Sequence, residues 1–195
     1  MLLLIGSYGF GQDTLEIKKS TVLKRPQPWV CATKDDVTIS DDEIEQTEAI
    51  ESIRISVEQI NNDSSYTTKT LNSEEFQTEV YDGGGELRGY FKDGELVKMI
   101  EWTGLSSCAY LTEYYLKEGQ LIFAYTQGKE FQYVDSIASF NYDIQTLVME
   151  GRFYYKNGKK VKDIVKGATR CSGQLGKDWF KSYQDDAKYY SKLLK

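Results

Sequence analysis

Apolar and polar residues alternate along the middle of the chain, from Phe76 to Tyr133, in a pattern that predicts an antiparallel β-meander. Asp93-Gly94 stands between two alternating segments, and such a pair is a strong hairpin signal because a type I′ turn needs φ > 0 at both central residues. The same phrase returns at Glu118-Gly119 and again at Asn157-Gly158. The sequence therefore predicts three hairpins in one sheet.

Two-residue turns fix the register of strand pairing, so the pattern also assigns side chains to the two faces of the sheet. The predicted core face pairs Phe91 with Leu96, Leu87 with Ile100, Leu116 with Leu121 and Tyr114 with Phe123. The opposite face mixes aromatic rings with charges, and its candidate binding residues are Arg88, Tyr90, Glu101, Glu113 and Tyr115. Two interpretations stay open for this face: a shallow ligand or partner surface, or a solvated or helix-covered face with cross-strand ion pairs.

The third hairpin does not follow the pattern of the first two. On its expected core face Tyr155 pairs with Lys160, whereas Tyr154 and Val161 fall on the opposite face. Either this hairpin has two apolar faces or its turn is not of the two-residue type.

Two segments outside the meander have the periodicity of helices. A helix over 41–61 places Ala49, Ile50, Ile53, Val57 and Ile60 on one stripe, and Ser40 to Glu43 has the capping-box pattern. The competing interpretation is a strand, because Ile53, Ile55 and Val57 alternate with polar residues. A second amphipathic helix is predicted over 178–194. The expected fold class is α+β: an antiparallel β-meander sheet of about six to eight strands with an N-terminal helix and a C-terminal amphipathic helix.

The first 39 residues look different from the rest. Residues 1–11 hold a short apolar run followed by small residues, which resembles the end of a signal peptide without its basic region; an apolar N-terminal strand is the alternative. Residues 12–39 contain both prolines and predict an extended or disordered lead-in, so 40–195 is expected to be a single α+β domain. No run approaches the length of a transmembrane helix.

Charge is distributed unevenly along the 195 residues. Residues 1–150 hold 12 basic against 26 acidic residues, a net charge of −14, and residues 151–195 hold 12 against 4, a net charge of +8. A basic tail is typical of nucleic-acid binding, but this one faces an acidic body in the same chain. Internal charge complementarity is therefore expected, with no nucleic-acid partner.

The residue types exclude several kinds of chemistry. The chain has no histidine, which removes Ser-His-Asp and Cys-His nucleophilic systems and histidine-ligated zinc. No Cys-x-x-Cys pair and no phosphate-loop motif is present, so no metal and no cofactor is expected. A carboxylate pair such as Glu101 and Glu113 leaves a glycoside-type hydrolase as a minor alternative to a non-enzymatic protein.

Three cysteines, Cys31, Cys108 and Cys171, are odd in number. In an exported protein they allow one disulfide and one leftover thiol, with three pairings that the sequence does not rank. Buried free thiols are the alternative.

The hairpin phrases Tyr-Tyr-Lys-Asn-Gly-Lys at 154–159 and Tyr-Leu-Lys-Glu-Gly-Gln-Leu-Ile at 115–122 resemble the hairpin repeats of MORN-like proteins. More broadly, the signal-like start, the run from Gly85 through Trp102 and the Phe-Tyr-Tyr hairpin resemble uncharacterised secreted proteins of Bacteroidota-type bacteria. This resemblance implies a periplasmic or secreted setting and carries no catalytic residues across.

The sequence thus predicts a secreted, non-enzymatic binding or interaction protein of the cell envelope, with an unknown protein or small-molecule ligand. The first alternative is a small-molecule or lipid carrier with an apolar cavity between sheet and helix. The second is the carboxylate-based hydrolase.

Overall fold

The computed structural model describes residues 41–79, 81–171 and 179–195, which belong to one compact unit, Ile39–Lys195. The predictions for residues 1–11, for residues 12–39, for Ser40 and for Cys31 lie outside the described residues. The elements are α1 (Asp41–Asn62), β1 (Thr67–Asn72), α2 (Ser73–Phe76), β2 (Gly85–Lys92), β3 (Glu95–Gly104), β4 (Cys108–Lys117), β5 (Gln120–Val134), the 3-10 turn η1 (Asp135–Ile137), β6 (Ser139–Lys156), β7 (Lys159–Gly167) and α3 (Trp179–Leu194).

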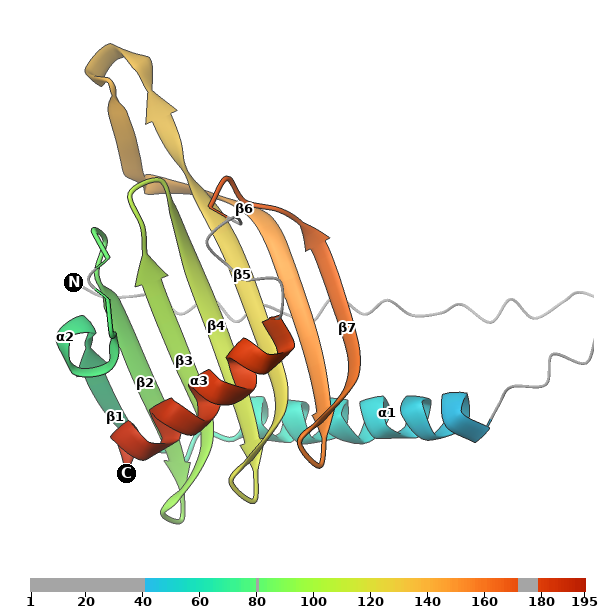
Figure 1. Ribbon diagram of the computed structural model, residues 1–195. Coiled ribbons are helices and arrows are strands. Elements are labelled where there is room, and N and C mark those ends of the chain that lie inside the picture. The colour runs from blue at the N-terminus through green and yellow to red at the C-terminus, as the bar shows by residue number, and fades with distance from the viewer. Residues whose placement is uncertain (1–40, 80, 172–178) are drawn as a thin grey trace, which may run out of the picture. The chain divides into compact units, whose positions relative to one another are not determined.

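The seven strands form one antiparallel sheet in the order of the sequence, β1 to β7. Figure 1 shows α3 lying across one face of this sheet and α1 across the other face. The predicted α+β meander with a helix at each end is confirmed. None of the described helices is long and apolar enough to cross a membrane.

The three predicted turns are confirmed by their backbone conformation. Asp93, Glu118 and Asn157 have φ of 51°, 52° and 52°, and the glycine that follows each also has positive φ. Two consecutive left-handed residues match the twist of the flanking strands, which is the reason for the short hairpin loop. The third hairpin therefore does have a two-residue turn.

Each of these turns is followed by a β-bulge, which the sequence interpretation missed. Phe91 pairs with Leu96 as predicted, but Tyr90 then pairs with Lys98, so Val97 has no partner. Ile122 and Val161 are skipped at the same place in the other two hairpins. An extra residue shifts the pairing by one and reverses which face the later side chains occupy.

The bulges correct the predicted register beyond the first pairs of each hairpin. Leu87 pairs with Glu101 instead of Ile100, and Tyr114 pairs with Ala124 instead of Phe123. Leu116 still pairs with Leu121 as predicted.

The third hairpin has two apolar faces, which is the first of the two predicted alternatives, because consecutive residues of β6 point to opposite sides of the sheet. Tyr155 packs on the side of α3 and Tyr154 on the side of α1.

The helix interpretation of residues 41–61 is confirmed by α1. Ala49, Ile50, Ile53 and Val57 are buried, whereas Ile55, which breaks the stripe, is 50% exposed. The buried stripe packs on Tyr115, Phe123 and Tyr154 of the sheet. A strand would have placed Ile53 and Ile55 on the same face.

The second helix, α3, covers the larger core. Tyr183, Ala187, Tyr190 and Leu194 repeat every three or four residues and are buried against the sheet. Beneath them lie Leu87, Leu96, Met99, Tyr114, Leu116, Leu121, Ala124, Phe153 and Tyr155. Lys69 of β1 donates hydrogen bonds to the carbonyls of Leu193 and Leu194, which satisfies acceptors at the end of the helix.

Cys108 and Cys171 form a disulfide between the first residue of β4 and the segment after β7, 63 positions apart. This is one of the three pairings that the sequence left open. The bond closes a loop that contains β4 to β7, so it restricts the unfolded chain strongly.

Candidate functional site

Four of the five predicted site residues share one face of the sheet. The pairing registers place Tyr90, Lys98, Tyr115, Phe123 and Tyr154 in one row across the strands. A neighbouring row holds Arg88, Ile100, Glu113, Tyr125 and Arg152. Because α1 packs on Tyr115, Phe123 and Tyr154, both rows lie on the α1 face.

Glu101, the fifth predicted residue, lies on the opposite face. It pairs with Thr112, which neighbours the core residue Tyr114, and its carboxylate accepts a hydrogen bond from the Tyr114 hydroxyl at 2.7 Å. The bulge at Val97 is the reason, because it reverses the face of every later β3 residue. Glu101 and Glu113 therefore point to opposite sides of the sheet, and the carboxylate pair named for hydrolysis does not form.

On the α1 face, Tyr115 and Glu113 belong to a closed polar cluster. The Tyr115 hydroxyl donates to Glu113 at 2.5 Å and lies 3.0 Å from Oδ1 of Asn61, at the end of α1. Lys98 pairs with Glu113 at 2.6 Å and lies 4.8 Å from the Tyr115 ring centroid. Burial and the Glu113 charge raise the pKa of Tyr115 well above its usual range. Since Tyr115 is 2% exposed, this cluster fastens α1 to the sheet and offers little surface to a ligand.

Arg88 and Tyr90 are more accessible but also have partners. Arg88 forms an ion pair with Glu86 at 2.7 Å, and Tyr90 stacks edge-on with Tyr66 at 6.1 Å. The Tyr66 hydroxyl donates to the carbonyl of Ile60 in α1. An exposed ion pair such as Arg88–Glu86 contributes about 1 kcal/mol or less to the free energy of unfolding.

Farther along the same face, Glu150 repeats the arrangement of a carboxylate with a tyrosine and a cation. The Tyr125 hydroxyl donates to Glu150, Arg152 pairs with Glu150 at 3.4 Å, and the Arg152 guanidinium lies 5.2 Å from the Tyr125 ring centroid. Burial, with the hydrogen bond to Glu150, raises the pKa of Tyr125 to about 12. Glu113 and Glu150 thus each have a tyrosine hydroxyl and a cation as partners, as the cross-strand ion pairs of the second sequence interpretation would provide.

A second polar cluster lies between the sheet and α3, centred on Glu101. Besides the bond from Tyr114, Glu101 accepts a hydrogen bond from the Tyr190 hydroxyl at 3.0 Å and one from the Thr103 hydroxyl at 3.3 Å. Asp186 of α3 lies close enough for its charge to act on this cluster. Burial raises the pKa of Glu101, and burial with the Glu101 charge raises the pKa of Asp186 to about 6.

These two carboxylates are partly buried at the helix-sheet interface. The Tyr114 ring contacts the rings of Tyr183 and Tyr190 edge-on, with 6.1 and 5.8 Å between the ring centroids. Burial of Tyr114 and Tyr183 leaves a substrate little room beside the carboxylates. The arrangement suits a joint between α3 and the sheet.

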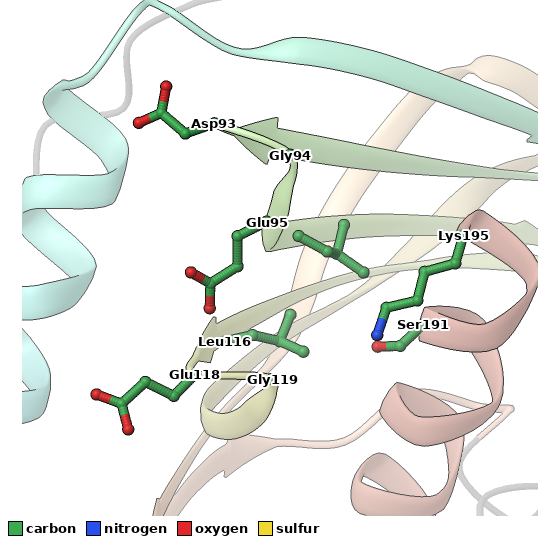
Figure 2. Close-up of a pocket in the computed structure, with 9 residues that line it drawn as sticks. Asp93, Gly94, Glu95, Leu116, Glu118, Gly119, Ser191 and Lys195 are labelled. Atoms are coloured by element: carbon green, nitrogen blue, oxygen red, sulfur yellow. The ribbon is translucent and has the colours of Figure 1, made fainter.

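Two surface grooves lie at the hairpin tips, away from this cluster. One, of about 490 Å³, runs between the turns at Gly94 and Gly119 and the end of α3. Figure 2 shows Lys195 and Ser191 on the α3 side, with the carboxylates of Asp93 and Glu118 pointing away from them. The other, of about 410 Å³, lies between α1 and the tips of the β4–β5 and β6–β7 hairpins. In the described part of the chain no three His, Cys, Asp or Glu residues gather as a metal site would require.

More than half of the exposed large hydrophobic residues of the described chain lie on a projecting hairpin that the sequence interpretation did not identify. We call residues 131–147 the arm. Pairing of β5 with β4 ends at Glu130, and pairing of β6 with β7 ends at Met149, so the arm continues as two strands alone. Figure 1 shows it extending beyond the ends of the neighbouring strands.

Five of the nine exposed large hydrophobic residues of the described chain lie in the arm. They are Tyr133 (48% exposed), Ile137 (64%), Tyr142 (55%), Ile144 (48%) and Leu147 (46%). Two edge-on ring pairs cross the arm, Phe131 with Tyr142 at 5.0 Å and Tyr133 with Phe140 at 5.2 Å. Cross-strand aromatic pairs of this kind hold a hairpin in shape.

A sequence signal for the arm was present. Phe140, Tyr142 and Ile144 alternate with Asn141, Asp143 and Gln145, which is the period of a strand. The pattern could not show that neither β4 nor β7 extends far enough to cover it.

Comparison of the chain with protein-family models, with curated proteins and with solved structures gave no match. The resemblance to MORN-like repeats therefore stays a prediction.

Proposed function

We propose that the chain is a secreted, non-enzymatic interaction protein of the cell envelope that contacts its partner through the arm. The observation that carries this proposal is the exposure of Tyr133, Ile137, Tyr142, Ile144 and Leu147 on one projecting hairpin. Exposed apolar patches on folded proteins mark contact sites, because the free energy of the system falls when apolar surface is removed from water.

The arm also has the rigidity that a contact element needs. A two-stranded hairpin by itself is marginally stable in water. Here its strands continue into the seven-stranded sheet, and the two ring pairs brace it. At its base, the Arg170 guanidinium pairs with Glu130 at 2.7 Å and lies 5.6 Å from the Phe140 ring centroid.

The proposed export has independent support in the disulfide. Cys108 is fully buried and bonded to Cys171. Disulfides of this kind persist in oxidising compartments and are rare in the cytosol of most organisms. This favours the periplasmic or secreted setting.

The two alternative functions have less support. For a carrier, the space between the sheet and α3 should hold an apolar cavity, yet Leu87, Met99, Tyr114 and Phe153 there are at most 1% exposed and belong to the same packed cluster as Tyr183. For a hydrolase, Glu101 and Asp186 would need to line an open cleft, and neither of the two described grooves is lined by them.

Site-specific photo-crosslinking in the producing cells tests the proposal. A benzophenone side chain at Tyr142 should give a discrete cross-linked adduct, because a partner buries this position. The matched control is Tyr189, a tyrosine of α3 that is 40% exposed and should give none. Equal yields at the two positions, or no adduct at Tyr142 in a folded variant, would refute the arm as a contact element.

A further inference from the structure

We propose that the partner of the arm is a second copy of this chain, with the two arms packed side by side in opposite directions. The proposal rests on the proposed function, since it names what covers the same surface. In a two-fold arrangement the tip of each arm lies against the base of the other, and both copies bury the same residues.

The backbone of the arm favours side-chain packing over the addition of another strand. Gln132 pairs with Asn141 while Phe131 pairs with Gln145, so three β6 residues, 142–144, bulge out of the ladder. The amide of Asp143 donates to the Asn141 side chain, and the Gln145 side chain donates to the carbonyl of Tyr142. An edge that is bulged and locally hydrogen-bonded is a poor template for a further strand.

The bulge directs the exposed apolar side chains outward. Tyr142 and Ile144, both near half exposed, are bulged residues. Ile137 lies at the tip and Leu147 near the base, so apolar groups run along the whole arm. Two antiparallel copies would therefore meet apolar surface along their full length.

Charge at the two ends of the arm favours the opposed direction. Asp135 stands in the tip turn η1, whereas Asp143 lies level with Phe131 and Gln132, nearer the base. Residues 131–147 contain no lysine or arginine. At the base stand Lys129 and Lys166, neither of which belongs to an ion pair of the described residues. Opposed arms bring the Asp135 carboxylate at the tip of one copy to the lysines at the base of the other, whereas arms in the same direction would bring Asp135 of the two copies together.

The same charges disfavour a lipid surface. An anionic bilayer attracts lysine and arginine, whereas the arm carries two carboxylates, Asp135 at its tip and Asp143 nearer its base. A membrane-bound arm is therefore an outcome against this proposal.

The exposed area sets the expected strength of the contact. Aromatic side chains bury roughly 150–250 Å² each and aliphatic ones less, so these five residues, each about half exposed, offer at most roughly 500 Å² per copy. Two copies then bury roughly 1,000 Å², which is at the lower limit for a specific interface. The dimer should be reversible, with a dissociation constant on the order of micromolar to tens of micromolar.

Sedimentation velocity of the purified chain over about 2 to 200 µM measures this equilibrium directly. The wild-type chain should shift from monomer to dimer across the range. Tyr142→Ser with Ile144→Ser should weaken association tenfold or more, while Tyr189→Ser, the control on α3, should leave it unchanged. Circular dichroism of each variant establishes that it is folded.

A charge exchange tests the orientation of the two arms. Asp135→Lys alone and Lys129→Asp with Lys166→Asp alone should each weaken self-association. An equimolar mixture of the two variants should recover it as a heterodimer, because each places opposite charges at the meeting ends. Failure of the mixture to recover association would overturn the opposed packing.

The two proposals fail in different ways. The second copy is not the partner if the chain stays monomeric to about 200 µM. The same holds if Tyr142→Ser with Ile144→Ser leaves the dimer unaltered. If Tyr142 still cross-links to another protein in that case, the contact function of the arm stands. If the cross-linked adduct has twice the mass of the chain, both proposals are supported.

Discussion

Asp186→Asn, a change in α3, should raise the free energy of unfolding at neutral and alkaline pH. Asp186 is partly buried between α3 and the sheet, close to Glu101, and its side chain accepts a hydrogen bond only from Ser182 among the described residues. Burial, followed by the charge of Glu101, raises its pKa from 3.8 to about 6. An asparagine keeps an oxygen for Ser182 and removes the charge.

The sign and the size follow from proton linkage. Between about pH 4 and pH 6 the folded chain holds a proton at Asp186 that the unfolded chain has released, so stability falls as the pH rises through the folded-state pKa. A pKa of about 6 instead of 3.8 corresponds to about 3 kcal/mol at 1.36 kcal/mol for each pKa unit. Partial exposure and relaxation around the charge reduce this, so the expected gain above pH 7 is about 1 to 3 kcal/mol.

Equilibrium urea unfolding followed by circular dichroism, near pH 4 and near pH 8, measures the effect. Asp186→Asn should raise the free energy of unfolding near pH 8 and leave it nearly unchanged near pH 4. Asp185→Asn, a change at the exposed neighbour, is the matched control and should do neither. A gain of equal size at both pH values would show that the charge is not responsible, and a loss near pH 8 would refute the reasoning outright.

Two further predictions test the turn and the disulfide. Gly94→Val should destabilise the first hairpin by about 1 to 3 kcal/mol, because a β-branched residue resists the φ of 82° at this position; a thermal melt equal to that of the wild type would contradict the turn assignment. A valine Cβ would meet nothing within 4 Å there, so any loss comes from the backbone and not from a clash. Cys171→Ser should lower the free energy of unfolding by about 4 kcal/mol, because the disulfide spans 63 positions; urea curves that coincide with and without a reducing agent in the wild-type chain would show that the bond does not form.

The candidate site was only partly accessible from the sequence. Arg88, Tyr90, Glu113 and Tyr115 do share a face, as predicted. They lie on β2 and β4, and the bulges that follow the turns lie on other strands, β3, β5 and β7. Glu101 was placed wrongly because it follows the bulge at Val97. The arm was missed because its exposure depends on where β4 and β7 stop, far away in the sequence.

By itself the sequence determined the local structure of this protein. The left-handed turns at Gly94, Gly119 and Gly158 need residues that tolerate positive φ, and the apolar spacing of α1 and α3 is set within one or two turns of helix. Because successive hairpins join neighbours in sequence, the order of the strands also followed.

Only the tertiary structure decided which side chains meet. A bulge after each turn costs little locally, so the packing of both sheet faces selects it. Contacts with α3 therefore decided that Glu101 and Met99 point to the α3 side of the sheet. The pairing of Cys108 with Cys171 depended on bringing the two ends of a four-strand segment together. The arm is exposed for the same reason: side-chain burial is a property of the neighbours that the fold supplies, and a segment's own pattern does not contain them.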